Sequence, residues 1–219
     1  MNDAPDLTLK ETRALLAPTI ARNAAFDGWG SAALALAANE HGVPAGKAEL
    51  AFEQGPAAMI DAWFAHIDAV MTERLPPQTL SAMRIRERIT ALVTARLEIA
   101  APDREALRRA LAILALPVNV RAGARLGWRA ADTMWRAAGD QATDFSHYTK
   151  RMTLGGVYFA TLMVFIDDDS ERFVDTRAFL ARRIDGVMRF EKLKAQLKPN
   201  PDAHFSPARF LGRLRYPVT

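Results

Sequence analysis

The sequence predicts an all-α protein built from about nine helices. Alanine, leucine and arginine dominate its composition. Apolar residues recur three and four positions apart in one segment after another, which is the spacing of a helix with one buried face. The 12 prolines fall mostly between these segments, where they separate helices rather than interrupt them. With 219 residues, 50% of them hydrophobic, the chain is long enough to bury a core in one large domain or two small ones.

Residues 1–55 are predicted to form three helices. The hydroxyl of Ser31 can cap the second helix, because it can accept from the free N–H groups of the first turn. Gly42 follows that helix, and Pro44 opens the third. Two short helices joined by Gly-Val-Pro resemble a helix-turn-helix, a suggestive but unspecific pattern. We expect the three helices at residues 7–22, 31–41 and 44–52.

Residues 56–198 are predicted to form a bundle of six further helices. Pro56 opens the fourth helix, Pro77 follows its end, and Pro102 and Pro117 bracket the sixth. The fourth to sixth helices are expected at residues 56–75, 81–100 and 102–116. Their apolar stripes are Ile60, Trp63, Phe64, Ile67, Val70 and Met71, then Ile85, Ile89, Leu92, Val93 and Leu97, then Leu107, Leu111 and Leu114.

The last three helices of the bundle are expected at residues 118–138, 144–166 and 170–197. Gly139 is a suitable stop for the seventh helix, and Thr143 or Asp144 can cap the eighth. The eighth contains an uncharged run of 15 residues, 152–166, which is short of the roughly 20 needed to cross a bilayer. A helix that is apolar on every side must be buried on every side. We therefore expect the eighth helix at the centre of the bundle, where it serves as a core helix or borders an apolar cavity.

Residues 199–219 are predicted to be a hinge and a basic amphipathic tail. Apolar residues of the tail recur at helical spacing, and arginines lie on the opposite side. Such helices lie on anionic membrane surfaces. Residues 189–219 also carry seven lysines and arginines against two acids. The predicted membrane-binding residues are Phe205, Arg209, Phe210, Leu211, Arg213 and Leu214.

Several kinds of chemistry have no support in the sequence. The chain has no cysteine, and its four histidines show no ligand spacing, so we expect no metal site and no cofactor. Nucleophile-elbow, Walker and dinucleotide-binding motifs are absent from the sequence, so we expect no catalytic residues and no enzyme activity. The first residues hold acids and no apolar run, unlike a secretory signal. We expect a cytoplasmic protein, peripheral on the inner membrane.

One known family resembles this chain over nearly its whole length. The resemblance is carried by Phe26-Asp-Gly-Trp29, residues 83–89 and 107–111, Asp132-Thr-Met-Trp135 followed by Gly139-Asp140, Asp144-Phe145, Tyr148-Thr-Lys-Arg151 and the tail at 206–215. These segments resemble the ubiquinone (coenzyme Q) biosynthesis accessory family, the lipid-binding ninth Coq protein, including its proteobacterial members. The resemblance implies a TetR-like fold that binds an isoprenoid lipid or ubiquinone intermediate. It also implies membrane attachment through the tail and presentation of demethoxyubiquinone to a di-iron hydroxylase.

The resemblance also implies two sets of site residues. The partner-binding patch is predicted at Asp132, Met134, Asp144, His147, Tyr148 and Arg151, with His147 standing where the family usually has tryptophan. A lipid cavity becomes the favoured interpretation of the apolar side chains on the seventh and eighth helices, and ordinary core packing is the alternative. The predicted lipid-binding residues are Trp128, Trp135, Val157, Tyr158, Leu162 and Phe165.

Two other functions are compatible with this predicted arrangement of helices. One is a TetR-type DNA-binding regulator with an apolar inducer pocket, and the other is a structural subunit without a ligand. DNA binding depends on lysine and arginine contacts to phosphates, whereas residues 1–50 hold four basic residues against six acids. The segment 44–52 offers only Lys47 against Glu49. We therefore predict no nucleic-acid partner. TetR-like folds commonly pair through their last two long helices, so the resemblance also implies a homodimer.

Overall fold

The computed structural model describes residues 7–143 and 145–197, and these ranges are α-helical without β-strands, which confirms the predicted all-α class. The α-helices are α1 (Leu9–Asp27), α2 (Ser31–Glu40), α3 (Ala45–Ala51), α4 (Pro56–Arg74), α5 (Pro77–Ser81), α6 (Ile85–Ala100), α7 (Arg104–Ala115), α8 (Val120–Ala137), α9 (Phe145–Phe165) and α10 (Val174–Leu197). Three short 3₁₀ turns, at Ala101–Asp103, Pro117–Asn119 and Glu171–Phe173, join the later helices.

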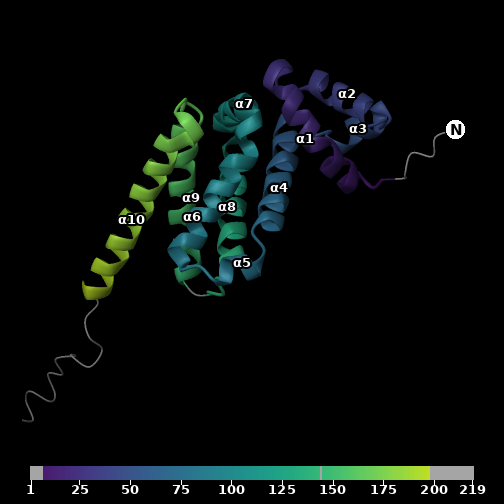
Figure 1. The fold of residues 1–219 in the computed structure, drawn as a ribbon. Coiled ribbons are helices and arrows are strands. Elements are labelled where there is room, and N and C mark those ends of the chain that lie inside the picture. Colours follow the sequence, from purple (N-terminus) through teal and green to yellow (C-terminus); the bar gives the residue numbers. More distant parts are fainter. Residues whose placement is uncertain (1–6, 144, 198–219) are drawn as a thin grey trace, which may run out of the picture.

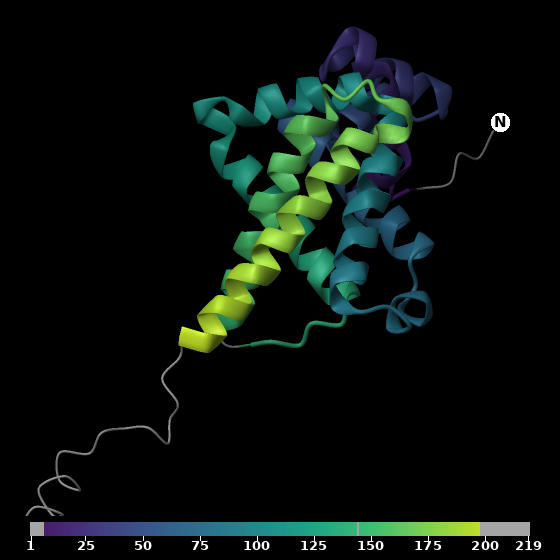
Figure 2. The same cartoon turned by 60° about the vertical axis from the view of Figure 1, so that its left-hand side comes forward.

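The helices form one elongated body with the N-terminal part at one end. Helices α1–α3 lie beside one end of the bundle, in which α4, α6, α8 and α9 run side by side (Figure 1). Helix α10 packs on α9 and α6, and its C-terminal part diverges from the bundle (Figure 2).

Two helix boundaries differ from the sequence prediction. Helix α1 continues five residues beyond the expected end and stops at Gly28, whose φ of 76° is the left-handed conformation that glycine adopts without strain. The segment expected to begin one helix near Ser81 is split into α5 and α6. Arg84 lies between them with extended backbone angles, and its N–H donates to the Glu87 carboxylate at 2.9 Å. This capping bond starts α6 at Ile85, later than the apolar spacing indicated.

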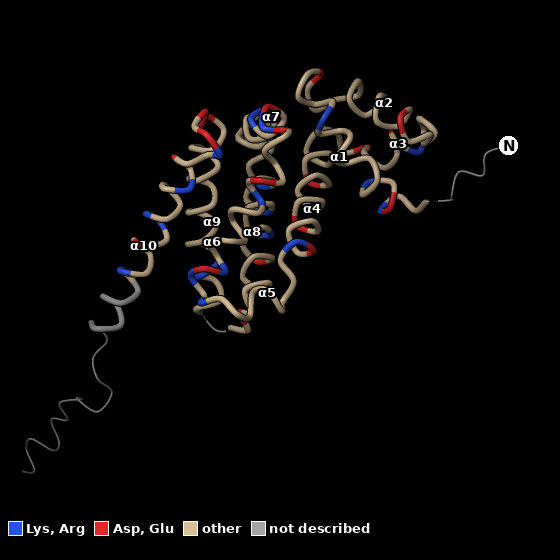
Figure 3. Tube along the Cα trace, in the orientation of Figure 1, with Lys and Arg blue, Asp and Glu red and all other residues tan. Residues whose placement is uncertain are grey.

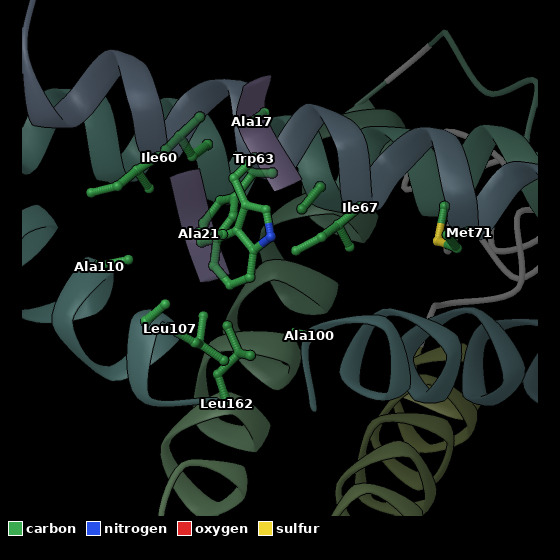
Figure 4. Close-up of a cluster of buried hydrophobic side chains, with 14 of the residues drawn as sticks. Ala17, Ala21, Ile60, Trp63, Ile67, Met71, Ala100, Leu107, Ala110 and Leu162 are labelled. Atoms are coloured by element: carbon green, nitrogen blue, oxygen red, sulfur yellow. The ribbon is translucent and has the colours of Figure 1, made fainter. Parts of the chain in front are cut away.

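The hydrophobic core is continuous from the N-terminal helices into the bundle. Trp63 of α4 is 2% exposed and lies among side chains of α1, α6, α7 and α9 (Figure 4). Its ring centroid is 5.5 Å from that of Trp29, which precedes α2. The Trp29 indole N–H donates to the Ala106 carbonyl oxygen at 2.9 Å. Trp29, between α1 and α2, is thereby fixed to α4 and α7, which are far from it in the sequence.

The connection from α9 to α10 is held by a buried carboxylate. Asp168 is 6% exposed and accepts from the backbone N–H groups of Ser170 at 2.9 Å and Thr176 at 2.8 Å, and from both hydroxyls. Acidic residues gather at this turn (Figure 3), where Arg104 and Arg108 of α7 pair with the neighbouring Asp169 and Asp167. The turn thus fixes the direction in which α10 leaves α9.

Asp168→Asn is predicted to destabilise the protein, most clearly near neutral pH. Burial raises the pKa of Asp168, but the hydrogen bonds from Ser170 and Thr176 outweigh burial and lower the pKa from 3.8 to about 2. Because the folded pKa is depressed, this stabilisation is present above pH 3.8 and is lost as the pH falls toward 2. We expect Asn to cost about 2 kcal/mol at pH 7. Urea unfolding at several pH values measures this, and equal stability of both proteins at pH 7 would contradict it.

Candidate functional site

Helix α9 separates two hollows, one on each side. The larger, which we call the α8–α9 cavity, has a volume of about 700 Å³. The smaller, which we call the α9–α10 groove, has a volume of about 340 Å³. Both fall in the range of roughly 300–1,000 Å³ that ligand pockets occupy.

The α8–α9 cavity is lined almost entirely by apolar side chains. Arg108 is the one charged residue among its described lining residues, and its guanidinium group is already paired with Asp167 at 2.7 Å. The lining comprises Phe64, Leu111, Ala112, Leu114, Ala115, Val120, Gly123, Ala124, Leu126, Gly127, Ala130, Gly155, Tyr158, Phe159, Leu162, Met163 and Ile166. This surface suits an uncharged hydrocarbon chain.

Glycines of α8 and α9 make the cavity wide. A Cβ atom on Gly127 would have no other atom within 4 Å, so the missing side chain corresponds to open cavity. On α9, a Cβ atom on Gly155 would lie 3.9 Å from the Ala131 Cβ. The adjacent glycines Gly155 and Gly156 of α9 face different surroundings. Gly155 faces α8, whereas Gly156 is exposed and faces open space.

The predicted lipid-binding residues are divided between the two hollows. Tyr158 and Leu162 line the α8–α9 cavity, and Trp135 and Val157 line the α9–α10 groove. Phe165 is fully buried and packs on Phe173, with ring centroids 4.8 Å apart. Trp128 belongs to neither lining set, and lies instead against His147 and Tyr148. The sequence could not separate these surroundings, because all six residues lie on the same two helices.

A buried charge cluster behind Tyr158 was missed by the sequence analysis. The Arg96 guanidinium carbon lies 5.1 Å from the Tyr158 ring centroid, and Arg96 is 1% exposed. Burial lowers the pKa of Arg96, but Tyr158 and the paired Asp68 raise it above its ordinary value, so Arg96 stays charged. Asp68 also pairs with Arg129 of α8. The cluster fixes the Tyr158 ring in the cavity wall.

The predicted partner patch contains a buried ionic cluster. Arg151 is 2% exposed, and its Nε lies 2.6 Å from an Asp132 oxygen while a terminal nitrogen lies 3.1 Å from Asp140. Asp140 also pairs with Lys150 at 2.6 Å. Burial raises the pKa of Asp140, but Lys150 and Arg151 lower it below its ordinary value. Met134 is fully buried as well. These residues join α8 to α9 and present little surface to a partner.

The part of the predicted patch at the surface is aromatic. His147 and Tyr148 have ring centroids 5.2 Å apart, and Trp128 of α8 lies 6.0 Å from Tyr148 and 6.4 Å from His147. A His147 ring nitrogen is 2.9 Å from the Ala142 carbonyl oxygen, so the ring is held rather than freely exposed. Asp144 lies outside the described residues. We call Trp128, His147 and Tyr148 the aromatic cluster.

Helix α9 is less buried than its apolar run indicated. The prediction that it is covered on every side is wrong, because Met152 is 70% exposed and Phe159 is 56% exposed. Helices α8, α10 and α6 pack around α9, and the side that carries Tyr148, Met152, Gly156 and Phe159 stays open. These residues recur at three and four positions, so they form one exposed stripe that starts at the aromatic cluster.

Three further predictions from the sequence concern the membrane-binding tail, metal sites and membrane-spanning helices. The predicted membrane-binding residues of the tail lie outside the described residues. In the part of the chain that is described, no group of histidines and acids has a metal-binding arrangement. Within the same part, no single helix is long and apolar enough to cross a membrane, although the segments 85–115 and 117–137, bent by 91° at their junction, meet the criterion together.

The arrangement of the helices defines the class of this protein. It is an all-helical protein with a TetR-like fold: it superposes on a TetR transcriptional regulator from Nitrosomonas europaea with a TM-score of 0.64, covering 81% of this chain and 98% of the other at 24% identity. That likeness concerns the fold alone.

Sequence comparisons find similarity to one family. The COQ9 family model matches residues 120–191, which include α8, α9 and most of α10. The chain is similar to the mitochondrial ubiquinone biosynthesis proteins COQ9 of Rattus norvegicus, at 40% identity over 111 residues, and of Xenopus tropicalis, at 33% over 168 residues. These matches cover 51% and 74% of this chain, and 36% and 53% of the relatives. The chain is therefore similar to the COQ9 proteins over the matched regions, and it spans about a third to a half of the length of these two relatives.

Proposed function

We propose that this protein is a non-catalytic, lipid-binding accessory protein of ubiquinone biosynthesis. In this proposal the α8–α9 cavity holds the isoprenoid tail of a quinone intermediate. The observation that carries the proposal is the cavity itself, which has a volume of about 700 Å³ and a nearly uncharged lining. Most of its lining residues lie within residues 120–191, the region that matches COQ9. Burial of each CH₂ group contributes about 0.8 kcal/mol, so a chain of several isoprene units binds without polar recognition.

The proposal is tested by separating the tail from the head group. Titration with a ubiquinone that has a short isoprenoid tail should give saturable binding. Titration with the same benzoquinone lacking the tail should give none, because the apolar lining supplies the binding energy. Equal binding of the two compounds would contradict the assignment of the cavity to the tail.

The aromatic cluster is the surface we propose for the hydroxylase partner, a di-iron enzyme. Aromatic side chains are enriched in the central contacts of protein interfaces, and Tyr148 is 56% exposed. The cluster lies at the start of the exposed stripe of α9. Phe159, in the same stripe, also lines the α8–α9 cavity. A partner seated there would lie next to a lipid in the cavity. Arg151 and Asp132 hold α9 in place beneath this surface.

Removal of residues 205–219 is predicted to abolish binding to vesicles. The deleted segment carries the predicted membrane-binding side chains, and each cation near an anionic surface contributes about 1 kcal/mol. Sedimentation with anionic liposomes measures the loss, and thermal unfolding should be nearly unchanged. A truncated protein that still sediments would show that another surface is the membrane anchor. Attachment of this kind makes the protein peripheral on an inner membrane.

We retain the homodimer as part of the proposal. Exposed apolar side chains on α10, including Val174 and Phe190, provide a surface for pairing that is separate from the aromatic cluster. Sedimentation equilibrium measures the mass in solution.

The alternative function, DNA binding, gains little from α3, whose exposed positions hold Ala45, Gly46, Glu49 and Leu50. Binding to duplex DNA that weakens steeply with salt would favour the alternative.

A further inference from the structure

The α9–α10 groove differs from the cavity in having a charged end. Its walls are apolar and come from four helices: Ile85 and Ile89 of α6, Trp135 of α8, Leu154 and Val157 of α9, and Ile184, Val187 and Met188 of α10. Two cations also line it, Arg86 in the first turn of α6 and Lys150 in the second turn of α9. Ser146, Thr149 and Thr153 add hydroxyl groups along the same part of α9.

The charge at this end is only partly neutralised by the protein. Lys150 shares the Asp140 carboxylate with Arg151, and the Lys150 side chain is 38% exposed. Arg86 pairs with Asp185 at 2.7 Å and is 51% exposed. A lysine has three N–H donors and an arginine five, so each retains donors for a further acceptor. Both cations also stand near helix N-termini, where the helix dipole favours a negative charge.

We propose that the α9–α10 groove is a second ligand site, which takes a single-chain amphiphile with an anionic head group, such as a fatty acid. The acyl chain lies against Ile89, Leu154 and Ile184, and the carboxylate or phosphate head lies between Lys150 and Arg86. The proposal does not depend on the isoprenoid cavity, which is on the opposite side of α9 and whose one charged lining residue is paired with Asp167.

A ligand in the groove would hold α10 more firmly against the bundle. In the described residues α10 is held mainly by α9 and α6, and its C-terminal part diverges from the bundle (Figure 2). An acyl chain in the groove would add contacts between Ile184, Val187 and Met188 on α10 and the facing walls. The ligand therefore couples the groove to the helix that leads into the tail.

The test uses the full-length protein, with palmitate as the probe. We expect palmitate to bind saturably by isothermal titration calorimetry, and inorganic phosphate alone not to bind because it lacks the chain. In Gly127→Phe, where the α8–α9 cavity is filled, we expect hexadecanol to bind at least about tenfold more weakly than palmitate because it lacks the charge. Amide exchange in α10 should slow when palmitate is bound. Two substitutions fill the groove from facing walls: Thr153→Phe on α9 and Val187→Phe on α10. Each should weaken palmitate binding at least about tenfold.

Gly127→Phe, which fills the other cavity, is the matched control and should leave palmitate affinity unchanged. Loss of palmitate binding in Gly127→Phe, together with unchanged binding in both groove variants, would place the fatty acid in the α8–α9 cavity and overturn the proposal. Equal affinities of Gly127→Phe for palmitate and hexadecanol would overturn the assignment of the head group to Lys150 and Arg86. Saturable binding of inorganic phosphate alone would likewise overturn the amphiphile as the ligand.

Discussion

Gly127→Phe should abolish binding of a short-tailed ubiquinone while the protein stays folded. A side chain at this position enters the α8–α9 cavity, because a Cβ atom there meets nothing within 4 Å. The phenyl ring then occupies space that the isoprenoid tail needs. Glycine inside a helix also costs about 1 kcal/mol relative to alanine, so the substitution does not weaken α8 itself. The binding titration should show a loss of at least about a hundredfold, corresponding to the burial of three or four CH₂ groups.

The same substitution at Gly156 is the matched control. Gly156 is also a helical glycine at which an added Cβ atom would meet nothing within 4 Å, but it is exposed and does not line the cavity. Gly156→Phe should keep the affinity of the unaltered protein. If Gly127→Phe bound the quinone normally, with an unchanged unfolding temperature, the tail would have to lie elsewhere.

Arg151→Ala should destabilise the protein by about 3–5 kcal/mol, the cost of removing one partner from a buried ion pair. Arg151 is 2% exposed and contacts Asp132, Asp140 and the His147 carbonyl oxygen. Without it, two carboxylates lose a charged partner between α8 and α9. Chemical denaturation measures the free energy of unfolding. The aromatic cluster rests on this contact, so affinity for the hydroxylase should fall as well.

Arg136→Ala tests whether burial causes that effect. Arg136 also pairs with Asp132, at 2.9 Å, but its side chain is 72% exposed. An exposed pair of this kind contributes at most about 1 kcal/mol. Similar losses of stability in the two variants would mean that the buried cluster has no special role.

Much of the fold was predictable from the helical spacing of apolar residues and from the prolines and glycines at helix ends. Pro56, Pro117 and Gly139 mark true helix boundaries, and stripes such as Ile60, Trp63 and Ile67 became core. The boundary at Ile85 was missed because it depends on the Glu87 capping bond, which apolar spacing does not report. The exposure of Met152 and Phe159 was missed for a related reason: hydrophobicity shows what a helix can bury, whereas the number of neighbouring helices decides what it does bury.

The candidate lipid site was predicted on two helices, without a division between the two hollows that lie beside them. Sequence reasoning gathered the aromatic and apolar residues of α8 and α9 into one lipid site, although α9 has a separate hollow on each side. The resemblance also placed Arg151 in the partner-binding patch, where an exposed side chain was expected. The acids that bury it, Asp132 and Asp140, precede it on another element. Pairing across helices of this kind has no signature in a single sequence.

The central claim is that the α8–α9 cavity holds an isoprenoid lipid, and the most direct test is to identify what the protein carries. Lipids extracted from the purified protein and from its Gly127→Phe variant should be compared by mass spectrometry. We predict an isoprenoid quinone or its precursor, in amounts comparable to the protein, with the unaltered chain, and its loss from the variant. An unaltered protein that carries no isoprenoid, or a variant that carries the same amount, would contradict the account.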